Sequence, residues 1–168
     1  MLYLFDLDGT LISGYMDNPD KDYDTWDVLP GRKAMLSRLI LRGDTVCVVT
    51  NQGGVAFGYV TDSQADRKIT DARIRLGIAP VRSSGDPLPP QVYACYADER
   101  GKPPWNNPAD AARRKPSGAM IQEAIADHPE AAALGVLFVG DREEDRQAAQ
   151  NADVAFQWAH IFFKEQKL

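Results

Sequence analysis

The chain has 168 residues, 44% hydrophobic and 26% charged, a composition typical of one globular domain with a sizeable core. Its net charge of −5 argues against tight, non-specific nucleic-acid binding, and its two cysteines are too few for a disulfide framework. No run approaches the roughly 18 apolar residues of a membrane span, and no signal segment is seen, so we expect one cytoplasmic domain, residues 1–168, as a monomer or weak homodimer.

The first predicted element is a short apolar strand at residues 2–5, followed by Asp6, Asp8 and Gly9. Burying acids at a strand end is costly unless a cation or hydrogen-bond donors compensate, so the pair predicts a site. One aspartate could attack phosphorus to form an aspartyl-phosphate, while the other protonates the leaving oxygen and later activates water. The alternative is a plain turn in which Asp8 and Gly9 supply a positive φ.

Residues 11–29 are polar and irregular, and their position predicts a flap over the site. Its aromatic residues either close on a substrate or pack the flap down, and we favour packing for all three: Tyr15, Tyr23 and Trp26. A helix is expected to open at Pro30-Gly31 and to end near Gly43.

A second apolar strand is predicted at residues 45–49, and it ends in the polar segment Thr50-Asn51-Gln52-Gly53-Gly54. That segment is either a phosphate-binding loop or a polar turn. A helix from about 63 to 76, stopped by Gly77, and a strand at 91–96 follow.

A long loop at residues 97–114, rich in Pro and Asn, leads to Arg114 and Lys115. Loops of this length are usually functional or mobile, so we predict a substrate-specificity element here. The alternatives are a surface excursion for the loop and a solvated charge for Lys115.

The last elements alternate helix and strand: helix 117–127, strand 136–139, helix 142–151 and strand 153–157. Asp141 follows the first of these strands and is either a site acid or a helix N-cap. Asp145, one turn later, either ligates a metal, orients Lys115, or lies on a solvated helix face. The apolar tail 158–163 packs on the sheet or forms a dimer contact.

This alternation predicts an α/β fold with a mainly parallel sheet, in which ligands bind beyond the carboxyl ends of the strands. A phosphomonoester is a dianion, and a divalent cation must screen it from the site carboxylates. Asp6, Asp8 and Asp141 supply the hard oxygens that suit Mg²⁺. Lys115 would add a fixed positive charge on the phosphoryl oxygens, and Thr50 would add a hydroxyl donor.

Four motifs resemble those of the haloacid dehalogenase (HAD) superfamily, in order and over nearly the whole chain: Asp6-Leu-Asp-Gly-Thr10, Thr50-Asn51, Lys115 and Gly140-Asp141…Asp145. Within it, the segments around Gln52-Gly53, Arg114-Lys115-Pro116 and Asp141-Arg142 are similar to the subfamily III branch of histidinol-phosphate and heptose-bisphosphate phosphatases. The 3′-phosphatase domains of polynucleotide repair enzymes are relatives of the same type. The resemblance implies a three-layer α/β/α Rossmann-like domain, and no interval is long enough for a large cap domain.

The resemblance also implies a role for each matching position. Asp6 would be the nucleophile and Asp8 the general acid/base. Three residues would bind phosphate, namely Thr50, Asn51 and Lys115. Magnesium would be held by the Asp6 side chain, the Asp8 backbone carbonyl and Asp141, with Asp145 either on the metal or on Lys115. Four further residues would sit near the substrate, namely Gln52, Gly53, Arg114 and Arg142.

One departure from the heptose-phosphatase pattern concerns zinc. Those relatives often carry three Cys and a His before the Arg-Lys-Pro motif, whereas residues 92–114 contain only Cys95 and no His. Tetrahedral zinc needs four ligands, so no structural zinc is expected.

Three functions remain open at this point. The first is a Mg²⁺-dependent phosphomonoesterase for a small metabolite, of the sugar-phosphate or histidinol-phosphate type. The second is a 3′-phosphatase on DNA or RNA ends, which an open, capless site would admit. The third is a non-catalytic binding module. A protein with an idle site has no physical need to cluster three acids and a lysine, which argues against this function.

Overall fold

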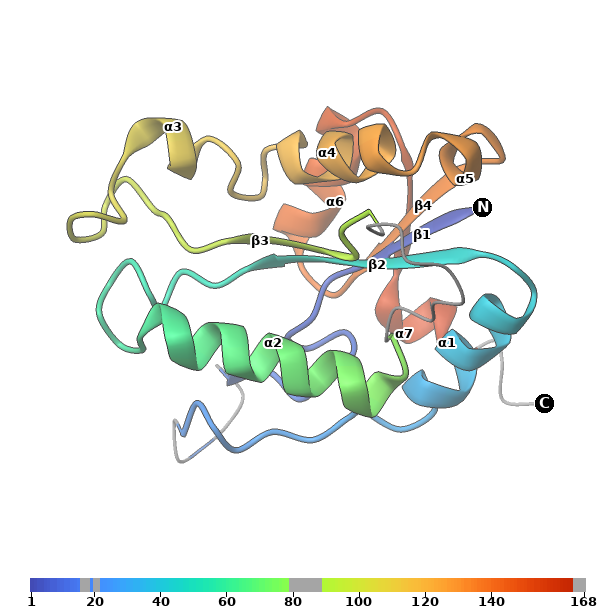
Figure 1. The fold of residues 1–168 in the computed structure, drawn as a ribbon, viewed down its shortest axis with the longest axis horizontal. Helices are drawn as coiled ribbons and strands as arrows, with labels where there is room; N and C mark the ends of the chain where they lie inside the picture. Colours follow the sequence, from blue (N-terminus) through green and yellow to red (C-terminus); the bar gives the residue numbers. More distant parts are fainter. Residues whose placement is uncertain (16–18, 20–21, 79–88, 165–168) are drawn as a thin grey trace.

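A parallel sheet lies at the centre of the molecule (Figure 1). The computed structural model describes residues 1–15, 19, 22–78 and 89–164. Within them the sheet has five strands in the order β3-β2-β1-β4-β5, namely β1 (Leu2–Phe5), β2 (Thr45–Asn51), β3 (Val92–Cys95), β4 (Val136–Gly140) and β5 (Ala155–Trp158). All four pairings are parallel, as the alternation of strands and helices predicts.

Helices cover both faces of the sheet, which confirms the three-layer α/β/α architecture (Figure 1). One layer contains α1 (Arg32–Leu41), α2 (Asp62–Leu76) and α7 (Ala159–Phe162), and the other contains α4 (Ala119–Asp127), α5 (Pro129–Ala133) and α6 (Glu143–Asn151). In β1, Tyr3 and Phe5 pack toward the first layer, while Leu2 and Leu4 pack toward the second. Burial on both faces explains why the strands read as continuous apolar runs.

Strand β1 is the point at which the strand order of the sheet changes direction. From β1 the sheet extends through β2 and β3 on one side and through β4 and β5 on the other. Such a switch point opens a crevice at the carboxyl ends of the central strands. Asp6 follows β1, Asn51 ends β2 and Asp141 follows β4, so the predicted motifs converge on this crevice.

Helix α2 is specified at both ends by its sequence. Thr61 and Gln64 form a reciprocal capping box, and Gly77 closes the helix with a φ of 77°. The buried face follows helical spacing, but it contains a charged residue: Ala65, Lys68, Ile69, Ala72 and Leu76.

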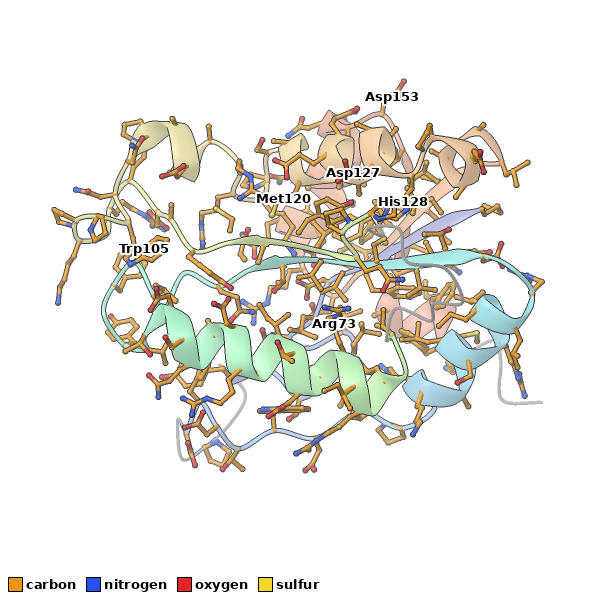
Figure 2. The ribbon with its side chains drawn as sticks, in the orientation of Figure 1. Arg73, Trp105, Met120, Asp127, His128 and Asp153 are labelled. Carbon is orange, nitrogen blue, oxygen red and sulfur yellow. The ribbon has the colours of Figure 1, made fainter. Side chains whose placement is uncertain are left out.

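The prediction missed three short helices and misplaced one strand start. Helix α3 (Pro108–Ala111) is a single turn capped by Asn107, α5 has Pro129 at its first turn, and α7 is a four-residue helix in the apolar tail. All three are too short to leave a periodic apolar pattern in the sequence. Strand β5 begins at 155 rather than 153, because Asp153, which Figure 2 labels, occupies a left-handed turn with φ 56°.

The apolar tail packs against the sheet, in agreement with the first of its two predicted roles. Phe162 and Phe163 are both 8% exposed, and their rings lie 5.5 and 6.0 Å from the ring of Phe5. This aromatic cluster covers β1 from the α7 side.

The predicted flap is described only in part, because residues 16–18 and 20–21 lie outside the described residues. Its base is tied down where Ile12 bridges Val28 in antiparallel fashion. Tyr23 is buried and Trp26 is half-buried against the core.

Among the helices that the structure describes, none has both the length and the apolar character required to span a bilayer.

Candidate active site

A buried lysine holds two carboxylates at the carboxyl end of β1. The Lys115 ammonium donates to Asp6 Oδ1 and to Asp145 Oδ1, each at 2.6 Å, and to the backbone oxygen of Val49 at 3.1 Å. Its three protons therefore all have an acceptor. We call Asp6, Thr50, Lys115 and Asp145 the floor; each is buried, with at most 6% of the residue exposed.

Burial and charge act in opposite directions on these groups. Burial raises the pKa of Asp6 well above its ordinary range, although the Lys115 ammonium opposes this. Burial alone would lower the pKa of Lys115, but the carboxylates of Asp6 and Asp145 raise it above its ordinary value. Lys115 is therefore a permanent cation that fixes the Asp6 carboxylate in place.

A third acid joins the floor from β4. Asp6, Asp141 and Asp145 each offer a carboxylate oxygen, and these oxygens lie within 4.8 Å of one another. Burial, followed by the charge of Asp145, raises the pKa of Asp141. Lys115 pairs with Asp6 and Asp145, and Asp141 lies 4.0 Å from the half-exposed guanidinium of Arg142, so the buried negative charge exceeds the buried positive charge here. These hard oxygens fit a divalent cation such as Mg²⁺, whose charge would compensate that excess.

Local structure explains how Asp141 and Asp145 reach the floor. Gly9 has a φ of 87°, and a side chain at that position would collide with the Asp141 carboxylate. Asp141 is not a helix N-cap, because Arg142 takes that position at the start of α6. Asp145 faces inward and is 1% exposed, with Oδ2 accepting from the Arg142 backbone N–H at 3.1 Å.

Residues at the end of β2 fix the position of Lys115 and of Gln52 by hydrogen bonds. The Asn51 side chain donates to the backbone oxygen of Lys115 and accepts from its backbone N–H, both at 3.0 Å. This two-point contact fixes the backbone of Lys115 across 64 residues of sequence. Thr50 is 1% exposed and accepts from Gln52 Nε2 at 2.9 Å.

Asp8 lies beyond the turn and points to different partners from those of Asp6. Its Oδ1 accepts from Lys68 Nζ at 2.5 Å, and its Oδ2 accepts from Gln52 Nε2 at 2.8 Å. The carboxylate of Asp8 is thus bound on both oxygens and stays outside the acid cluster around Asp141.

Arg114 is held beside the site by an acid that the sequence analysis did not single out. Its Nε lies 3.3 Å from Asp98 Oδ2, and Nη1 is buried with no hydrogen-bond partner among the residues that the structure describes. A Cβ at Gly53 would approach Nη1 to 2.7 Å, so glycine leaves room for the guanidinium. Asp98 also accepts from Arg100, which lowers the pKa of Asp98 to about 2.

A cavity of about 500 Å³ opens over these residues. Of the predicted site residues, eight line it: Asp6, Asp8, Asn51, Gln52, Gly53, Arg114, Lys115 and Arg142. Thr50, Asp141 and Asp145 are not among the lining residues. We call Phe57, Tyr59, Arg114 and Arg142 the rim; all four line the cavity, and Tyr59 is 73% exposed.

Sequence reasoning missed three features of the site, namely Asp98, Lys68 and the segment that contains Phe57 and Tyr59. Lys68 carried a signal, because it lies in the apolar stripe of α2. The segment that contains Phe57 and Tyr59 carried none, since exposed loops have no periodicity. Trp105 packs with Tyr96 near the N-terminal end of α2, which brings the 97–114 loop beside that segment (Figure 2).

Comparison with known proteins identifies the class. The family model for polynucleotide kinase 3 phosphatase matches residues 1–165. Among curated proteins, D-glycero-beta-D-manno-heptose-1,7-bisphosphate 7-phosphatase from Pseudomonas putida is 34% identical over 148 residues, which are 88% of this chain and 75% of that protein. The enzyme of the same name from Pseudomonas aeruginosa is 31% identical, over 90% of this chain and 76% of its own length.

Solved structures agree. A HAD-like phosphatase from Mesorhizobium loti superposes with a TM-score of 0.69 at 30% identity, over 91% of this chain and 68% of that one. D,D-heptose 1.7-bisphosphate phosphatase from B. bronchiseptica, in complex with magnesium and phosphate, gives a TM-score of 0.65 at 26% identity, over 92% and 78%.

Sheet, site and comparisons together define a phosphatase of the HAD-like type. The chain belongs to the polynucleotide kinase 3 phosphatase family. This agrees with the superfamily resemblance found in its motifs.

Proposed function

We propose that the chain is a Mg²⁺-dependent phosphomonoesterase that acts on a sugar phosphate through an aspartyl-phosphate. The observation that carries this proposal is that Asp6 and Asp8 line one cavity with different partners. Asp6 is paired with Lys115, and Asp8 is held by Lys68 and Gln52. Two carboxylates in different environments suit two different roles in one reaction.

In the first half-reaction, a carboxylate oxygen of Asp6 attacks phosphorus and the bond to the alcohol oxygen breaks. Asp8 gives its proton to that leaving oxygen. Lys115 holds Asp6 in line and adds positive charge near the phosphoryl oxygens. In the second half-reaction, Asp8 takes a proton from water, which attacks the acyl phosphate, releases inorganic phosphate and restores Asp6.

Magnesium would be held by Asp6, Asp141 and the backbone carbonyl of Asp8, and it would supply positive charge against the substrate dianion. Asp145 is proposed to act on Lys115, to which it is hydrogen-bonded, and on the cation through the same acid cluster. Arg114 and Arg142 are proposed to contact the alcohol side of the substrate, because both line the cavity outside the floor. Thr50 and Asn51 are proposed to complete the phosphate site from β2.

A sugar phosphate is favoured because the two curated relatives described above are named as heptose-bisphosphate phosphatases. The polynucleotide 3′-phosphatase alternative rests on a separate observation. Phe57 and Tyr59 form an aromatic pair at the rim with centroids 6.0 Å apart, beside Arg114. Aromatic rings and cations together suit single-stranded nucleic acid.

Phosphate release should be measured with Mg²⁺ and with EDTA. The panel should contain D-glycero-β-D-manno-heptose 1,7-bisphosphate, other sugar phosphates, histidinol phosphate, nucleotides and a 3′-phosphorylated oligonucleotide. We expect Mg²⁺-dependent turnover of a sugar phosphate that Asp6→Asn abolishes. A preference for the oligonucleotide, weakened by salt, would support the alternative. Absence of turnover on the whole panel would contradict both and favour a binding module.

A further inference from the structure

Lys68 is a charged residue in the middle of a buried helix face. The face of α2 that packs inward consists of Ala65, Lys68, Ile69, Ala72 and Leu76. The Lys68 side chain is only 2% exposed. Burial of an ammonium group is costly unless a partner compensates, and an apolar side chain would fill this position at no such cost. The charge at this position therefore needs an explanation beyond packing.

The partner of Lys68 is Asp8, which is 60 residues away in sequence. Lys68 Nζ lies 2.5 Å from Asp8 Oδ1 and 4.3 Å from the centroid of the Tyr23 ring. Asp8 itself is 21% exposed and lines the cavity, so the pair joins a buried cation to a carboxylate that faces the substrate space. Helix α2 therefore contacts the site through the Lys68 side chain.

The other oxygen of Asp8 is fixed by a second chain of contacts. Gln52 Nε2 donates to Asp8 Oδ2 at 2.8 Å and to Thr50 Oγ1 at 2.9 Å. The Tyr23 hydroxyl donates to Gln52 Oε1 at 2.7 Å, which orients the amide so that its nitrogen faces Asp8. Lys68 packs on the ring of the same tyrosine. Lys68 and Gln52 therefore hold the carboxylate from two sides.

We propose that Lys68 is a positioning residue. It holds the Asp8 carboxyl group in the orientation that faces the leaving-group oxygen of the substrate. This proposal rests on the proposed function, in which Asp8 is the general acid/base. A carboxylate that has lost one of two fixed contacts can rotate about its side-chain torsions. Misplacement of a catalytic group by about 1 Å is enough to slow a reaction roughly 10²-fold.

The test compares leaving groups. p-Nitrophenolate leaves without being protonated, whereas the alkoxide of a sugar phosphate needs the proton from Asp8. For Lys68→Met we expect kcat/KM on the sugar phosphate to fall roughly 10²-fold, while kcat/KM on p-nitrophenyl phosphate falls by less than about fivefold. The ratio kcat/KM is compared because it reports phosphoryl transfer to Asp6, whereas kcat also contains hydrolysis of the acyl phosphate, which both substrates share. Equal losses on both substrates, or no loss on either, would overturn the proposal.

Two controls separate the possible failures. Arg67→Met removes a neighbouring exposed cation of α2 and should leave both rates unchanged. Asp8→Asn should show the same leaving-group selectivity as Lys68→Met, only more strongly. If Asp8→Asn lacks that selectivity, the acid role in the proposed function fails. If Asp8→Asn has it and Lys68→Met does not, only the inference about Lys68 fails.

A second variant covers the case in which Lys68→Met does not fold. Lys68→Ala leaves a space that propylammonium can fill. Added propylamine should restore turnover of the sugar phosphate at least tenfold in Lys68→Ala and should do nothing for Asp8→Asn. Failure of the amine to restore turnover in a folded Lys68→Ala enzyme would contradict the positioning role.

Discussion

The floor and the rim of the cavity are built in different ways. In the floor, every polar group described above has a protein partner, and Lys115 and Asp145 are each 2% exposed or less. In the rim, Tyr59 is 73% exposed, and Arg114 Nη1 has no hydrogen-bond partner in the described part of the chain. The comparison indicates that the floor is assembled before substrate arrives, whereas the rim keeps bonding capacity for the substrate. We therefore expect floor substitutions to act on kcat, and also on folding where they leave a buried charge unpaired, and rim substitutions to act on KM.

The largest expected effect is that of Asp6→Asn in the floor. Removing the proposed nucleophile should lower kcat by roughly 10³-fold or more, because no other carboxylate shares its position. The circular dichroism spectrum and the melting temperature should stay close to those of the parent, since asparagine can still accept from Lys115. Full retained turnover would contradict the assignment of the nucleophile.

Lys115→Met should damage both folding and activity. It leaves Asp6 and Asp145 buried without their common cation, so the free energy of unfolding should fall by about 3–5 kcal/mol. Urea denaturation measures this change. The double variant Lys115→Met/Asp145→Asn should recover part of the stability but none of the turnover. A single variant with parental stability would show that the floor is not held by this pair of contacts.

Asp98→Asn tests the support of the rim. Hydrogen bonds from Arg100 lower the pKa of Asp98 to about 2, below its ordinary value of about 3.9. A carboxyl group with a depressed pKa in the folded state stabilises the fold above the unfolded pKa, and this contribution is lost as the pH falls. Because Arg100 is largely exposed, solvent screens its interaction with Asp98. We therefore expect Asp98→Asn to lower the free energy of unfolding by only about 1–2 kcal/mol at pH 7.

The pH dependence provides the check on Asp98. The difference in unfolding free energy between parent and Asp98→Asn should be constant above about pH 4 and should shrink as the pH falls toward about 2. KM should also rise in the variant, because Arg114 loses its anchor. A stability difference that does not depend on pH would contradict the ion-pair explanation.

The smallest effect is expected at the aromatic part of the rim. Phe57→Ala and Tyr59→Ala should each raise KM by about 2- to 10-fold and leave kcat within about twofold, since ring contacts contribute about 0.5–1.5 kcal/mol. Ile74→Ala is a matched control, because Ile74 is also exposed but does not line the cavity. A large fall in kcat in either aromatic variant would erase the distinction between floor and rim.

Much of the fold could be predicted from the sequence because its signals are local. Apolar runs at residues 2–5, 45–49 and 136–139 predicted three strands, and the polar residues after them predicted a site at one sheet edge. Parallel strands bring their carboxyl ends together, so the convergence of Asp6, Asn51 and Asp141 followed from topology alone. The short helices α3, α5 and α7 could not be predicted, since one turn leaves no periodicity.

What the sequence determined by itself is therefore the α/β order of elements and the set of reactive residues at the strand ends. Only the tertiary structure decided the pairings: Lys115 with Asp6 across 109 residues, Lys68 with Asp8 across 60, and Arg114 with Asp98. The physical reason is distance along the chain. Local sequence sets the conformation of each segment, but the partner of a buried charge depends on how segments far apart in the chain pack together.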